Sequence, residues 1–521
     1  MNIPIKRALI SVTDKKLLEL LVKGLAGRSV EIIASGGTAK AIREAGLAVV
    51  DVSDVTAFPE MMNGRVKTLH PKIHGGILAD RENRAHLEQA AKHGIGLIDL
   101  VVVNLYRFRE AADNRSLGEK DVVEEIDIGG PALIRAAAKN FHSVAVVVDP
   151  ADYNAILKEM NENGGALALD TRRKLAAKAF FHTASYDAAV SRYFERITTA
   201  PGEFPAAWIT AYRKLQGLRY GENPHMRGAL YALDHAEGGL ARLAQLQGKE
   251  LSYNNIQDLY SAYLLARDIG RAGCAIIKHM NPCGAANCGT PAESFKRARR
   301  TDETSAFGSV VAFNDVVDRS TAETCADIFL EVIVSRGFKP EAIELFGKKK
   351  NLRLVAIPGE EWDRKAGGLT TREIGELLLV QDRDEGFPEL EAWKVVTTRV
   401  PSTEDEKALR LAWKIAKHVR SNAIVIGDAQ GTIGVGAGQM SRVDSCRIAV
   451  DKARREGLAT EGASAASDAF FPFPDGVEAL AEAGIRAIIQ PGGSVRDEEV
   501  IAAANRLGVA MVLTGVRHFR H

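Results

Sequence analysis

The chain has 521 residues, 46% hydrophobic and 26% charged, which is the composition of a soluble globular protein with several domains. Its 68 Lys and Arg residues nearly balance 67 Asp and Glu residues, and this net charge of +1 argues against a general nucleic-acid binder. Five cysteines in so long a chain argue against a disulfide framework and favour a reducing cytosol. We find no signal-peptide pattern and no run near the ~20 apolar residues of a membrane span.

Apolar runs alternate with helical patterns along the N-terminal part of the chain. We expect strands at 7–12, 29–35, 48–54, 97–106 and 144–150. Helical spacing fills the sequence between them, for example in LLELLVKGLAG and AKAIREAGL, and it continues from 151 to 196. Such alternation predicts an α/β fold with a mostly parallel sheet.

A domain boundary is expected at TTAPGEFP, residues 198–205, because prolines, a glycine and small polar residues gather there. A second α/β region follows and contains a weak internal repeat, in which AIIKH (275–279) corresponds to NAIVI (422–426). The repeat predicts two similar α/β halves, at about 206–390 and 391–521.

Two polar turns follow neighbouring predicted strands and precede helices. They are Thr13-Asp14-Lys15 and Ser35-Gly36-Gly37-Thr38. Free backbone N–H groups and the positive end of a helix dipole suit a phosphate at such a turn. The alternative is simple N-capping by Ser and Thr. Two turns together, with a lysine, favour phosphate.

Basic side chains gather between glycines in GRVKTLHPKIHGG, residues 64–76: Arg65, Lys67, His70, Lys72 and His74. We expect a loop that meets an anion, with a solvated basic loop as the alternative. The histidine spacing matches no zinc motif. Further along, Tyr106, Asp127 and Lys139 could form a proton-transfer network if buried together, although each alone is more often structural.

AIIKHMNPCGAANCG, residues 275–289, allows two interpretations. Lys278 and His279 at a strand end suit acid–base catalysis, whereas His279 with Cys283 and Cys288 could bind a metal. Zinc deaminases carry H-x-E followed by P-C-x-x-C, but this chain has a C-x4-C spacing and no such H-x-E. Later, the phenylalanines of SDAFFPFPDG could form a slot for a flat heterocycle or simply belong to the core.

These motifs resemble one family along nearly the whole chain. The N-terminal part resembles the bifunctional purine-biosynthesis enzymes that end the IMP pathway through ISVTDK, ASGGTAK, RVKTLHPKIHGG, NLY and IDIGGPALIRAAAKN. The C-terminal part resembles them through LRYGENPH, LSYNN, IKHMNPCG, SAFGS, KHVRSNAIV, GAGQMSR, SDAFFPF and RHFRH. The resemblance implies an IMP cyclohydrolase domain with a methylglyoxal-synthase-like fold over 1–199. Over 200–521 it implies a phosphoribosylaminoimidazolecarboxamide (AICAR) formyltransferase with a duplicated cytidine-deaminase-like fold that lacks zinc.

The resemblance also implies roles for individual residues. In the cyclohydrolase domain Lys139 would transfer protons, supported by Lys67, Tyr106 and Asp127. The implied nucleotide contacts there are Thr13, Asp14, Lys15, Ser35, Gly36, Gly37, Thr38, Arg65, Val66, Lys67, Thr68, Val103, Asn104, Asp127 and Ile128. In the transferase His279 would be the base, with Lys278 and Asn422 stabilising an oxyanion. The implied nucleotide contacts are Arg219, Tyr220, Gly308, Glu331 and Arg517, and the implied folate contacts are Asn422, Arg442, Phe470, Asp475, Ser494 and Val495, with Arg442 also a candidate on the nucleotide side.

The implied co-substrate is 10-formyltetrahydrofolate, which converts AICAR to formyl-AICAR before a dehydrative cyclisation to IMP. We expect no catalytic metal, no nucleic acid and no membrane partner, and the resemblance leaves room for a monovalent cation. It implies a homodimer in the cytosol. The chain departs from the family pattern at Arg107, at Met226 and in SRGFKP (335–340). Two alternatives remain: a regulatory nucleotide-binding module at the N-terminus, and a zinc deaminase.

Overall fold

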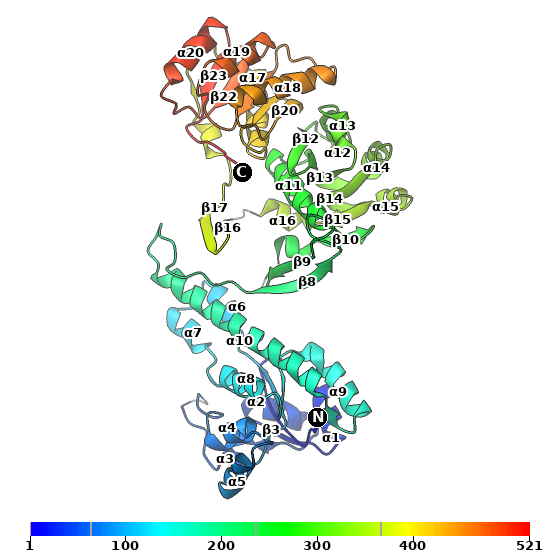
Figure 1. The fold of residues 1–521 in the computed structure, drawn as a ribbon, viewed down its shortest axis with the longest axis vertical. Helices are drawn as coiled ribbons and strands as arrows, with labels where there is room; N and C mark the ends of the chain where they lie inside the picture. Colours follow the sequence, from blue (N-terminus) through cyan, green and yellow to red (C-terminus); the bar gives the residue numbers. More distant parts are fainter. Residues whose placement is uncertain (1, 63–64, 235, 237, 365–366) are drawn as a thin grey trace. The chain divides into compact units, whose positions relative to one another are not determined.

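The computed structural model describes residues 2–62, 65–234, 236, 238–364 and 367–521. The chain divides into two compact units, Met1–Tyr212 (unit 1) and Arg213–His521 (unit 2), and each is described by itself (Figure 1). The boundary between the two units lies C-terminal to the predicted linker at 198–205, which itself comes after the long helix α10 (Leu169–Thr198).

Unit 1 is built on a parallel sheet whose described strands have the order β4-β3-β2-β5-β6. The strands are β2 (Arg7–Val12), β3 (Glu31–Ala34), β4 (Val50–Asp51), β5 (Leu100–Asn104) and β6 (Ala145–Val147). All neighbouring pairs are parallel, so the carboxyl ends of the strands meet at one edge. The α/β architecture predicted from the alternating pattern is confirmed.

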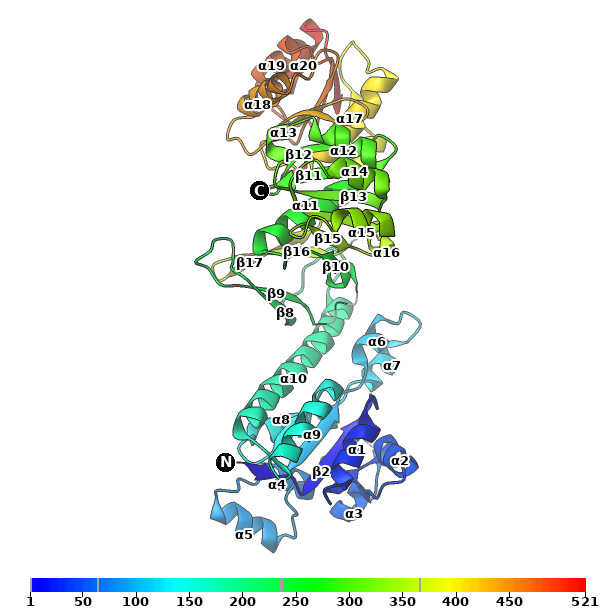
Figure 2. The ribbon, with the colours of Figure 1, turned by 90° about the vertical axis from the view of Figure 1, so that its right-hand side faces the viewer.

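Successive side chains of these strands point into two different cores, as the period of a strand requires. Leu9 and Val101 belong to one buried cluster, and Ile10 and Val102 belong to the other. Helices α4 (Pro71–Leu78), α8 (Gly129–Lys139) and α10 cover the first cluster, and α1 (Leu18–Ala26), α2 (Gly36–Glu44) and α9 (Tyr153–Glu162) cover the second (Figure 2). Shorter helices complete the unit: α3 (Val52–Thr56), α5 (Arg84–Lys92), α6 (Phe108–Asp113) and α7 (Glu119–Glu124).

The prediction of a loop throughout 64–76 is wrong, because α4 begins at Pro71. Proline fits the first turn of a helix, where its missing N–H would have no partner, and the His70 ring accepts a backbone N–H as the cap. Gly76 is tolerated inside the helix because a Cβ there would lie 2.5 Å from the Gly96 carbonyl oxygen. Close packing against a neighbouring backbone therefore explains a glycine that had suggested a loop.

The helical pattern expected from 151 to 196 is also interrupted. Gly164 and Gly165 adopt left-handed conformations, with φ of +61° and +87°, and end the helical run of α9. The chain then forms β7 (Ala166–Leu167), which pairs with β1 (Ile3–Pro4) before α10 begins. Two consecutive glycines were the local signal for this break.

Unit 2 contains two sheets of one topology. Among the described residues their strand orders are β10-β15-β14-β13-β11-β12 and β18-β23-β22-β21-β19-β20. The first sheet comprises β10 (Ala244–Gln247), β11 (Cys274–Lys278), β12 (Asn281–Ala286), β13 (Ser309–Val317), β14 (Leu330–Phe338) and β15 (Arg353–Ala356). The second comprises β18 (Lys394–Val395), β19 (Ile424–Gly427), β20 (Thr432–Gly436), β21 (Ser464–Ser467), β22 (Ala487–Gln490) and β23 (Ala510–Leu513). Corresponding pairs also run in the same directions, so AIIKH and NAIVI fall on the equivalent strands β11 and β19.

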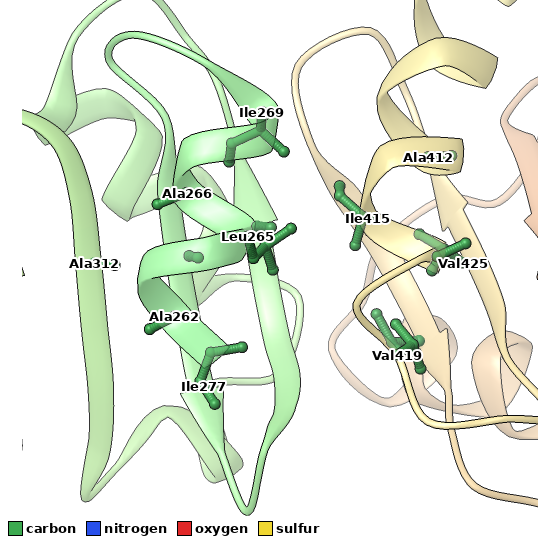
Figure 3. Packing of buried hydrophobic residues seen from close by; sticks show 14 of the residues in the cluster. Ala262, Leu265, Ala266, Ile269, Ile277, Ala312, Ala412, Ile415, Val419 and Val425 are labelled. Carbon is green, nitrogen blue, oxygen red and sulfur yellow. The ribbon is translucent and has the colours of Figure 1, made fainter. Parts of the chain in front are cut away.

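One buried cluster joins the two sheets of unit 2 through α11 (Tyr253–Ile269) and α17 (Thr403–Ala416). In Figure 3, Ala266 of α11 lies on the side of Ala312 in β13, whereas Leu265 lies on the side of Ile415 in α17. The outer faces are covered by α12 (Pro291–Arg299), α14 (Arg319–Cys325) and α15 (Pro340–Phe346) in the first sheet, and by α18 (Arg442–Arg455), α19 (Asp475–Glu482) and α20 (Asp497–Arg506) in the second. The short helix α13 (Glu303–Ala306) lies between β12 and β13 in the sequence, and α16 (Gly359–Asp363) lies between β15 and the β16–β17 hairpin.

Two hairpins of unit 2 leave large apolar side chains exposed. They are β8–β9 (Tyr212–Leu218 and Gly228–Leu233) and β16–β17 (Leu369–Ile374 and Leu377–Asp382). In β17, Leu377 is 70% exposed and Leu379 is 56% exposed. None of the helices in the described ranges has the length and apolar character needed to cross a bilayer.

Candidate functional site

At the carboxyl edge of the unit 1 sheet, two ammonium groups converge on a glycine turn. Ser35 is extended at the end of β3, and Gly36 follows with φ of +52° at the start of α2. A Cβ on Gly36 would lie 3.3 Å from Lys67 Nζ, and a Cβ on Gly37 would lie 3.7 Å from Lys15 Nζ. The buried Ser35 hydroxyl has no hydrogen-bond partner among the described residues, so it is available to a ligand. Two lysines at a helix N-terminus are an arrangement suited to binding an anion.

The neighbouring turn after β2 is shaped by Asn104, at the end of β5. Its Oδ1 accepts the Thr13 N–H at 2.6 Å and the Asp14 N–H at 3.0 Å, and its Nδ2 donates to the Asp14 carbonyl oxygen at 3.0 Å. Thr38 Oγ1 likewise accepts the N–H of Val12, the last residue of β2, at 3.0 Å and donates to the Val12 carbonyl oxygen at 3.1 Å. Asn104 and Thr38 therefore use their side chains to hold the turn that presents Lys15.

Asp127 stands just before α8 at this edge of the sheet, where its Oδ1 accepts the Gly130 N–H at 2.8 Å. Burial raises the pKa of Asp127, although backbone hydrogen bonds from Gly130 and Tyr106 and the charge of Lys67 oppose the rise. Burial, and then the negative charge of Asp127, raises the pKa of the Tyr106 phenol. A carboxyl group with a raised pKa beside a lysine is suited to exchanging protons with a bound substrate.

A cavity of about 250 Å³ opens beside the glycine turn. Its lining includes Ser35, Gly36, Val66, Lys67 and His70, together with residues of α3. The cavity has room for a small heterocycle whose anionic group would meet the lysines. Its position joins the predicted phosphate turn to the basic segment after residue 64.

The remaining predicted contacts of unit 1 differ in accessibility. Thr68 is buried, and a Cβ on Gly129 would lie 2.8 Å from its Oγ1. Ile128 is 63% exposed, whereas Val103 is 1% exposed inside the sheet, so the Val103 side chain cannot reach a ligand. Arg65 is exposed and forms an ion pair with Glu124.

Lys139 lies away from this cluster. It is the last residue of the 11-residue α8, whose length is about 16 Å at 1.5 Å per residue. Because α8 leads into β6, it runs from the carboxyl edge of the parallel sheet toward the opposite edge. Asn140, the next residue, is bonded there to the carbonyl oxygens of Ile77 and Ala79. On this geometry the backbone of Lys139 lies toward the edge of the sheet opposite the glycine turn, and its role in proton transfer stays a prediction.

In unit 2, Lys278 and His279 lie at the tip of the β11–β12 hairpin. His279 and Met280 form its two-residue turn with φ of +54° and +61°, which matches the twist of a hairpin but strains residues other than glycine. Asp258 of α11 accepts both turn amides, His279 N at 3.2 Å and Met280 N at 2.7 Å. Lys278 Nζ donates to the Phe307 carbonyl oxygen at 2.8 Å. The exposed His279 side chain thus stands on a turn that α11 holds in place.

Asn422, just before β19, is held by a dense set of hydrogen bonds. Its Nδ2 donates to the carbonyl oxygens of Gln439 at 2.9 Å and Met440 at 3.1 Å, and its Oδ1 accepts from Arg442 at 2.6 Å. Arg442 is buried and also donates to Asp468 Oδ1 at 2.5 Å. The Arg442 guanidinium therefore positions Asn422 and has little surface left for a folate.

The loop of Asn422 and the His279 turn meet where the two sheets of unit 2 adjoin. Arg420 N donates to Asn281 Oδ1 at 3.0 Å, and the Arg420 guanidinium lies 3.4 Å from the Met280 sulfur. The loop that carries Asn422 therefore contacts the hairpin that carries Lys278 and His279.

The other predicted contacts of unit 2 lie in pairs or on turns. The Arg219 guanidinium lies 5.8 Å from the centre of the Tyr220 ring, and Glu331 accepts from Arg353 Nη1 at 2.6 Å. Turns and the start of α19 carry the rest: Gly308, Phe470, Asp475, Ser494, Val495 and Arg517. The five cysteines are free, and the described residues contain no group of three or more His, Cys, Asp or Glu side chains that could hold a metal ion.

Comparison with known proteins decides the family. A model described as AICARFT/IMPCHase bienzyme matches residues 137–452, and one described as MGS-like domain matches residues 17–132. The bifunctional purine biosynthesis protein PurH of Magnetococcus marinus is 49% identical over 99% of this chain and 99% of its own, and that of Dinoroseobacter shibae is 52% identical over 100% and 99%. The chain belongs to the AICARFT/IMPCHase bienzyme family. The crystal structure of ForH matches 37% of this chain and 98% of its own with 38% identity and a TM-score of 0.33.

Membership of this bienzyme family confirms the function predicted from the motifs. The protein is a bifunctional enzyme of purine biosynthesis that combines AICAR formyltransferase and IMP cyclohydrolase activities, the last two steps of IMP synthesis. A formylated folate is the co-substrate of the transferase. The MGS-like domain lies in unit 1. The two alternatives, a regulatory module and a zinc deaminase, are therefore set aside.

Two positioning residues escaped the sequence analysis. Asp258 lies 21 residues before the His279 turn that it holds. Tyr186, on α10, accepts the Asp127 N–H at 2.8 Å from 59 residues away and donates to the Glu125 carbonyl oxygen at 3.1 Å. A polar residue on a packed helix was the only local signal, and it does not identify its partner.

Proposed function

We propose that the two reactions are divided between the two units, with cyclisation in unit 1 and formyl transfer in unit 2. The observation that carries this division is the chemistry of the two clusters. Lys15 and Lys67 converge on a glycine turn beside Asp127, which suits a phosphorylated ligand and proton transfer. Lys278 ends β11 beside the strained turn that carries His279, which suits acyl transfer to an amine.

In formyl transfer, the 5-amino nitrogen of AICAR attacks the formyl carbon of 10-formyltetrahydrofolate. This amine is conjugated with its ring and carboxamide, so it is a poor nucleophile and needs a base while the C–N bond forms. His279 accepts that proton, and Lys278 stabilises the oxyanion on the former carbonyl. Collapse of the intermediate breaks the bond to N10, which takes up a proton and leaves as tetrahydrofolate.

The hydrogen bonds of Asn422 favour a different role from the oxyanion donor that the resemblance suggested. Both N–H bonds of its amide are already donated to backbone carbonyls, whereas Oδ1 has accepted only the Arg442 donor. An amide oxygen can accept a second hydrogen bond. We therefore assign Asn422 to orienting the substrate by accepting an N–H, and leave the oxyanion to Lys278.

In cyclisation, the carboxamide nitrogen of formyl-AICAR attacks the formamide carbon and water leaves. The closure is intramolecular, so correct positioning supplies much of the rate. The Asp127 carboxylate takes a proton from the attacking nitrogen, and Lys67 protonates the former formyl oxygen, with Tyr106 nearby. The former formamide nitrogen then gives up its proton, and the hydroxyl group takes up a second proton and leaves as water. We give Lys67 the role that the resemblance implies for Lys139, because Lys67 lies at the glycine turn and Lys139 ends α8 at the opposite edge of the sheet.

The two lysines provide a matched test in the full-length protein. Lys67→Met is expected to lower the rate of IMP formation from supplied formyl-AICAR by about 10²- to 10⁴-fold, the usual range for acid–base groups. Lys139→Met is expected to leave that rate within a few-fold of wild type. Formyl transfer by both variants, followed as formyl-AICAR and IMP by mass, should persist. The reverse ranking of the two lysines would return the proton transfer to Lys139.

The same assay tests the division between the units. A His279 variant should still cyclise supplied formyl-AICAR, and the Lys67 variant should still consume 10-formyltetrahydrofolate. We propose cyclohydrolase and transferase domains at 1–199 and 200–521, and the remaining ligand contacts as inferred from the resemblance. If both variants lost both activities equally, the proposed division would be wrong.

The family resemblance and the exposed hairpins support a homodimer in the cytosol. Leu377 and Leu379 on β17 are large apolar side chains that a second copy could cover. Light scattering of the purified protein measures the oligomeric state directly. Replacement of potassium by a bulky quaternary ammonium ion in the assay tests whether a monovalent cation is needed.

A further inference from the structure

The C-terminal tail, residues 514–521, follows β23 and is bonded to the loop that joins α17 to β19. His518 N donates to the Asp468 carbonyl oxygen at 3.0 Å, and Ser421 N donates to the Arg520 carbonyl oxygen at 3.0 Å. The tail is therefore part of the packed structure near its end, although exposed basic tails are usually frayed.

His518 anchors this tail and is 2% exposed. Its Nδ1 lies 2.7 Å from Asp384 Oδ2 and its Nε2 lies 2.9 Å from Glu389 Oε1. A carboxylate oxygen faces each ring nitrogen, and the imidazolium form, with two N–H donors, is the form that can donate to both. Burial lowers the pKa of His518, but the bonds and charges of the two carboxylates outweigh it and raise the pKa. Trp413 Nε1 donates to the same Glu389 oxygen at 2.7 Å and fixes its position.

Other charged groups near His518 are paired among themselves. Lys417 Nζ lies 3.2 Å from Asp268 Oδ2, and His418 Nε2 lies 2.8 Å from the same oxygen. Burial lowers the pKa of His418 and so disfavours its charged form, although Asp268 opposes this. Two charged groups near His518 come from the segment around η4 (Pro388–Glu391): Asp384 precedes this helix and Glu389 lies within it. The others are Lys417 at the end of α17, Asp268 on α11 and Arg520 in the tail. Asp384 and Glu389 are the ones that contact His518.

The loop held by the tail carries half of the candidate transferase site. Ser421 directly precedes Asn422, and Arg420 N donates to the first residue of β12 at 3.0 Å, beside the His279 turn. We propose that His518 is a positioning residue for formyl transfer, whose charged ring fastens the tail and thereby holds Asn422 against the His279 turn. This inference rests on the proposed roles of Asn422 and His279.

The proposal predicts a pH dependence with a defined sign. The pKa of His518 is higher in the folded protein than in the unfolded chain, where it is ~6.5. Its stabilisation is therefore fully present below the unfolded pKa and is lost as the pH rises through the folded pKa. The tail loosens as the pH rises through that folded pKa, and kcat for formyl transfer falls over the same range. Cyclisation in unit 1 should not share this fall.

The test uses the full-length protein and measures kcat for formyl transfer from mildly acidic to alkaline pH. Asp384→Asn and Glu389→Gln remove one negative charge each and should move the alkaline fall to lower pH by about one unit or more. Glu391→Gln is the matched control, because Glu391 lies on the same short helix with its side chain 83% exposed. His518→Gln should lower transfer on the order of tenfold or more, as misplacement of catalytic groups does, with cyclisation of supplied formyl-AICAR unchanged.

Two results would overturn the role of His518. One is an unshifted pH profile in folded Asp384→Asn and Glu389→Gln proteins. The other is an equal loss of both activities in His518→Gln, which would indicate a merely structural contact. A separate variant tests the premise: normal transfer by Asn422→Ala would remove the proposed site role and the inference with it. If Asn422→Ala is inactive but the pH profile of Asp384→Asn is unshifted, the role of Asn422 would stand and only the proposed role of the tail would be rejected.

Discussion

The β11–β12 and β19–β20 hairpins occupy equivalent places in two sheets of one topology, yet their turns differ in conformation and use. The first turn has two residues, both left-handed, and it exposes His279. In the second turn, Asp428 Oδ1 accepts the N–H groups of Gln430 and Gly431, both at 2.9 Å. Among the described residues of that turn, none has a positive φ. One turn is strained and presents a reactive group, while its counterpart is relaxed and internally bonded.

The relaxed turn is bonded to the other sheet of unit 2. Asp428 Oδ2 pairs with Arg297 Nη2 at 2.8 Å, and Asn287 N donates to the Gln430 carbonyl oxygen at 2.7 Å. The backbone of the strained turn is instead held by hydrogen bonds to Asp258, and the His279 side chain is exposed to solvent. Strain of this kind persists where the surroundings over-determine the backbone, which is common at functional sites. If His279 has the proposed role, the duplicated topology supports chemistry at one turn and contacts between the two sheets at the other.

Paired alanine variants should separate the two turns most strongly. His279→Ala is expected to lower formyl transfer by about 10²- to 10⁴-fold, because it removes the base. Asp428→Ala is expected to leave transfer within a few-fold of wild type and to lower the free energy of unfolding by about 1–2 kcal/mol through lost hydrogen bonds. Steady-state transfer rates and denaturant unfolding measure both effects. Transfer near the wild-type rate in His279→Ala would contradict the assignment.

Asp258→Asn tests whether the strained turn depends on the carboxylate that accepts its two amide N–H groups. The carboxylate accepts two N–H groups with two oxygens, whereas an amide has one acceptor oxygen and would turn its NH₂ toward the other N–H. We expect transfer to fall on the order of tenfold, since small misplacements of catalytic groups are costly, while cyclisation of supplied formyl-AICAR is unchanged.

Glu293→Gln, on α12 and exposed, is a suitable control for Asp258→Asn because it changes the charge of unit 2 equally. Unimpaired transfer by Asp258→Asn would mean that the hairpin keeps its geometry without the carboxylate. The role of α11 would then be limited to packing.

The sequence supported some features of the fold and site better than others, for physical reasons. Strands such as β2 and β5 were predictable because burial on both faces leaves a short, nearly continuous apolar run. The glycine turn at Ser35 was predictable because an anion site at a helix N-terminus is encoded locally. The separation of Lys139 from Lys67 was not, because it depends on which edge of the sheet each helix end reaches. The contact between Asp258 and the His279 turn likewise arises only when α11 packs on β11.

Met280→Gly tests the smallest expected difference between the turns. A left-handed residue other than glycine costs roughly 1–2 kcal/mol, and glycine at the second position of a two-residue hairpin turn removes that cost. Loss of the partly buried Met280 side chain offsets part of the gain, so we expect unfolding to become harder by about 0.5 kcal/mol. Ala429→Gly in the relaxed turn should instead destabilise the protein by about 0.5–1 kcal/mol, because it only adds freedom to the unfolded chain. A midpoint that rises for Met280→Gly and falls for Ala429→Gly would support strain at the turn that carries His279 and not at its counterpart. A fall of both midpoints would mean that neither turn stores strain, and a rise of both would mean that each does.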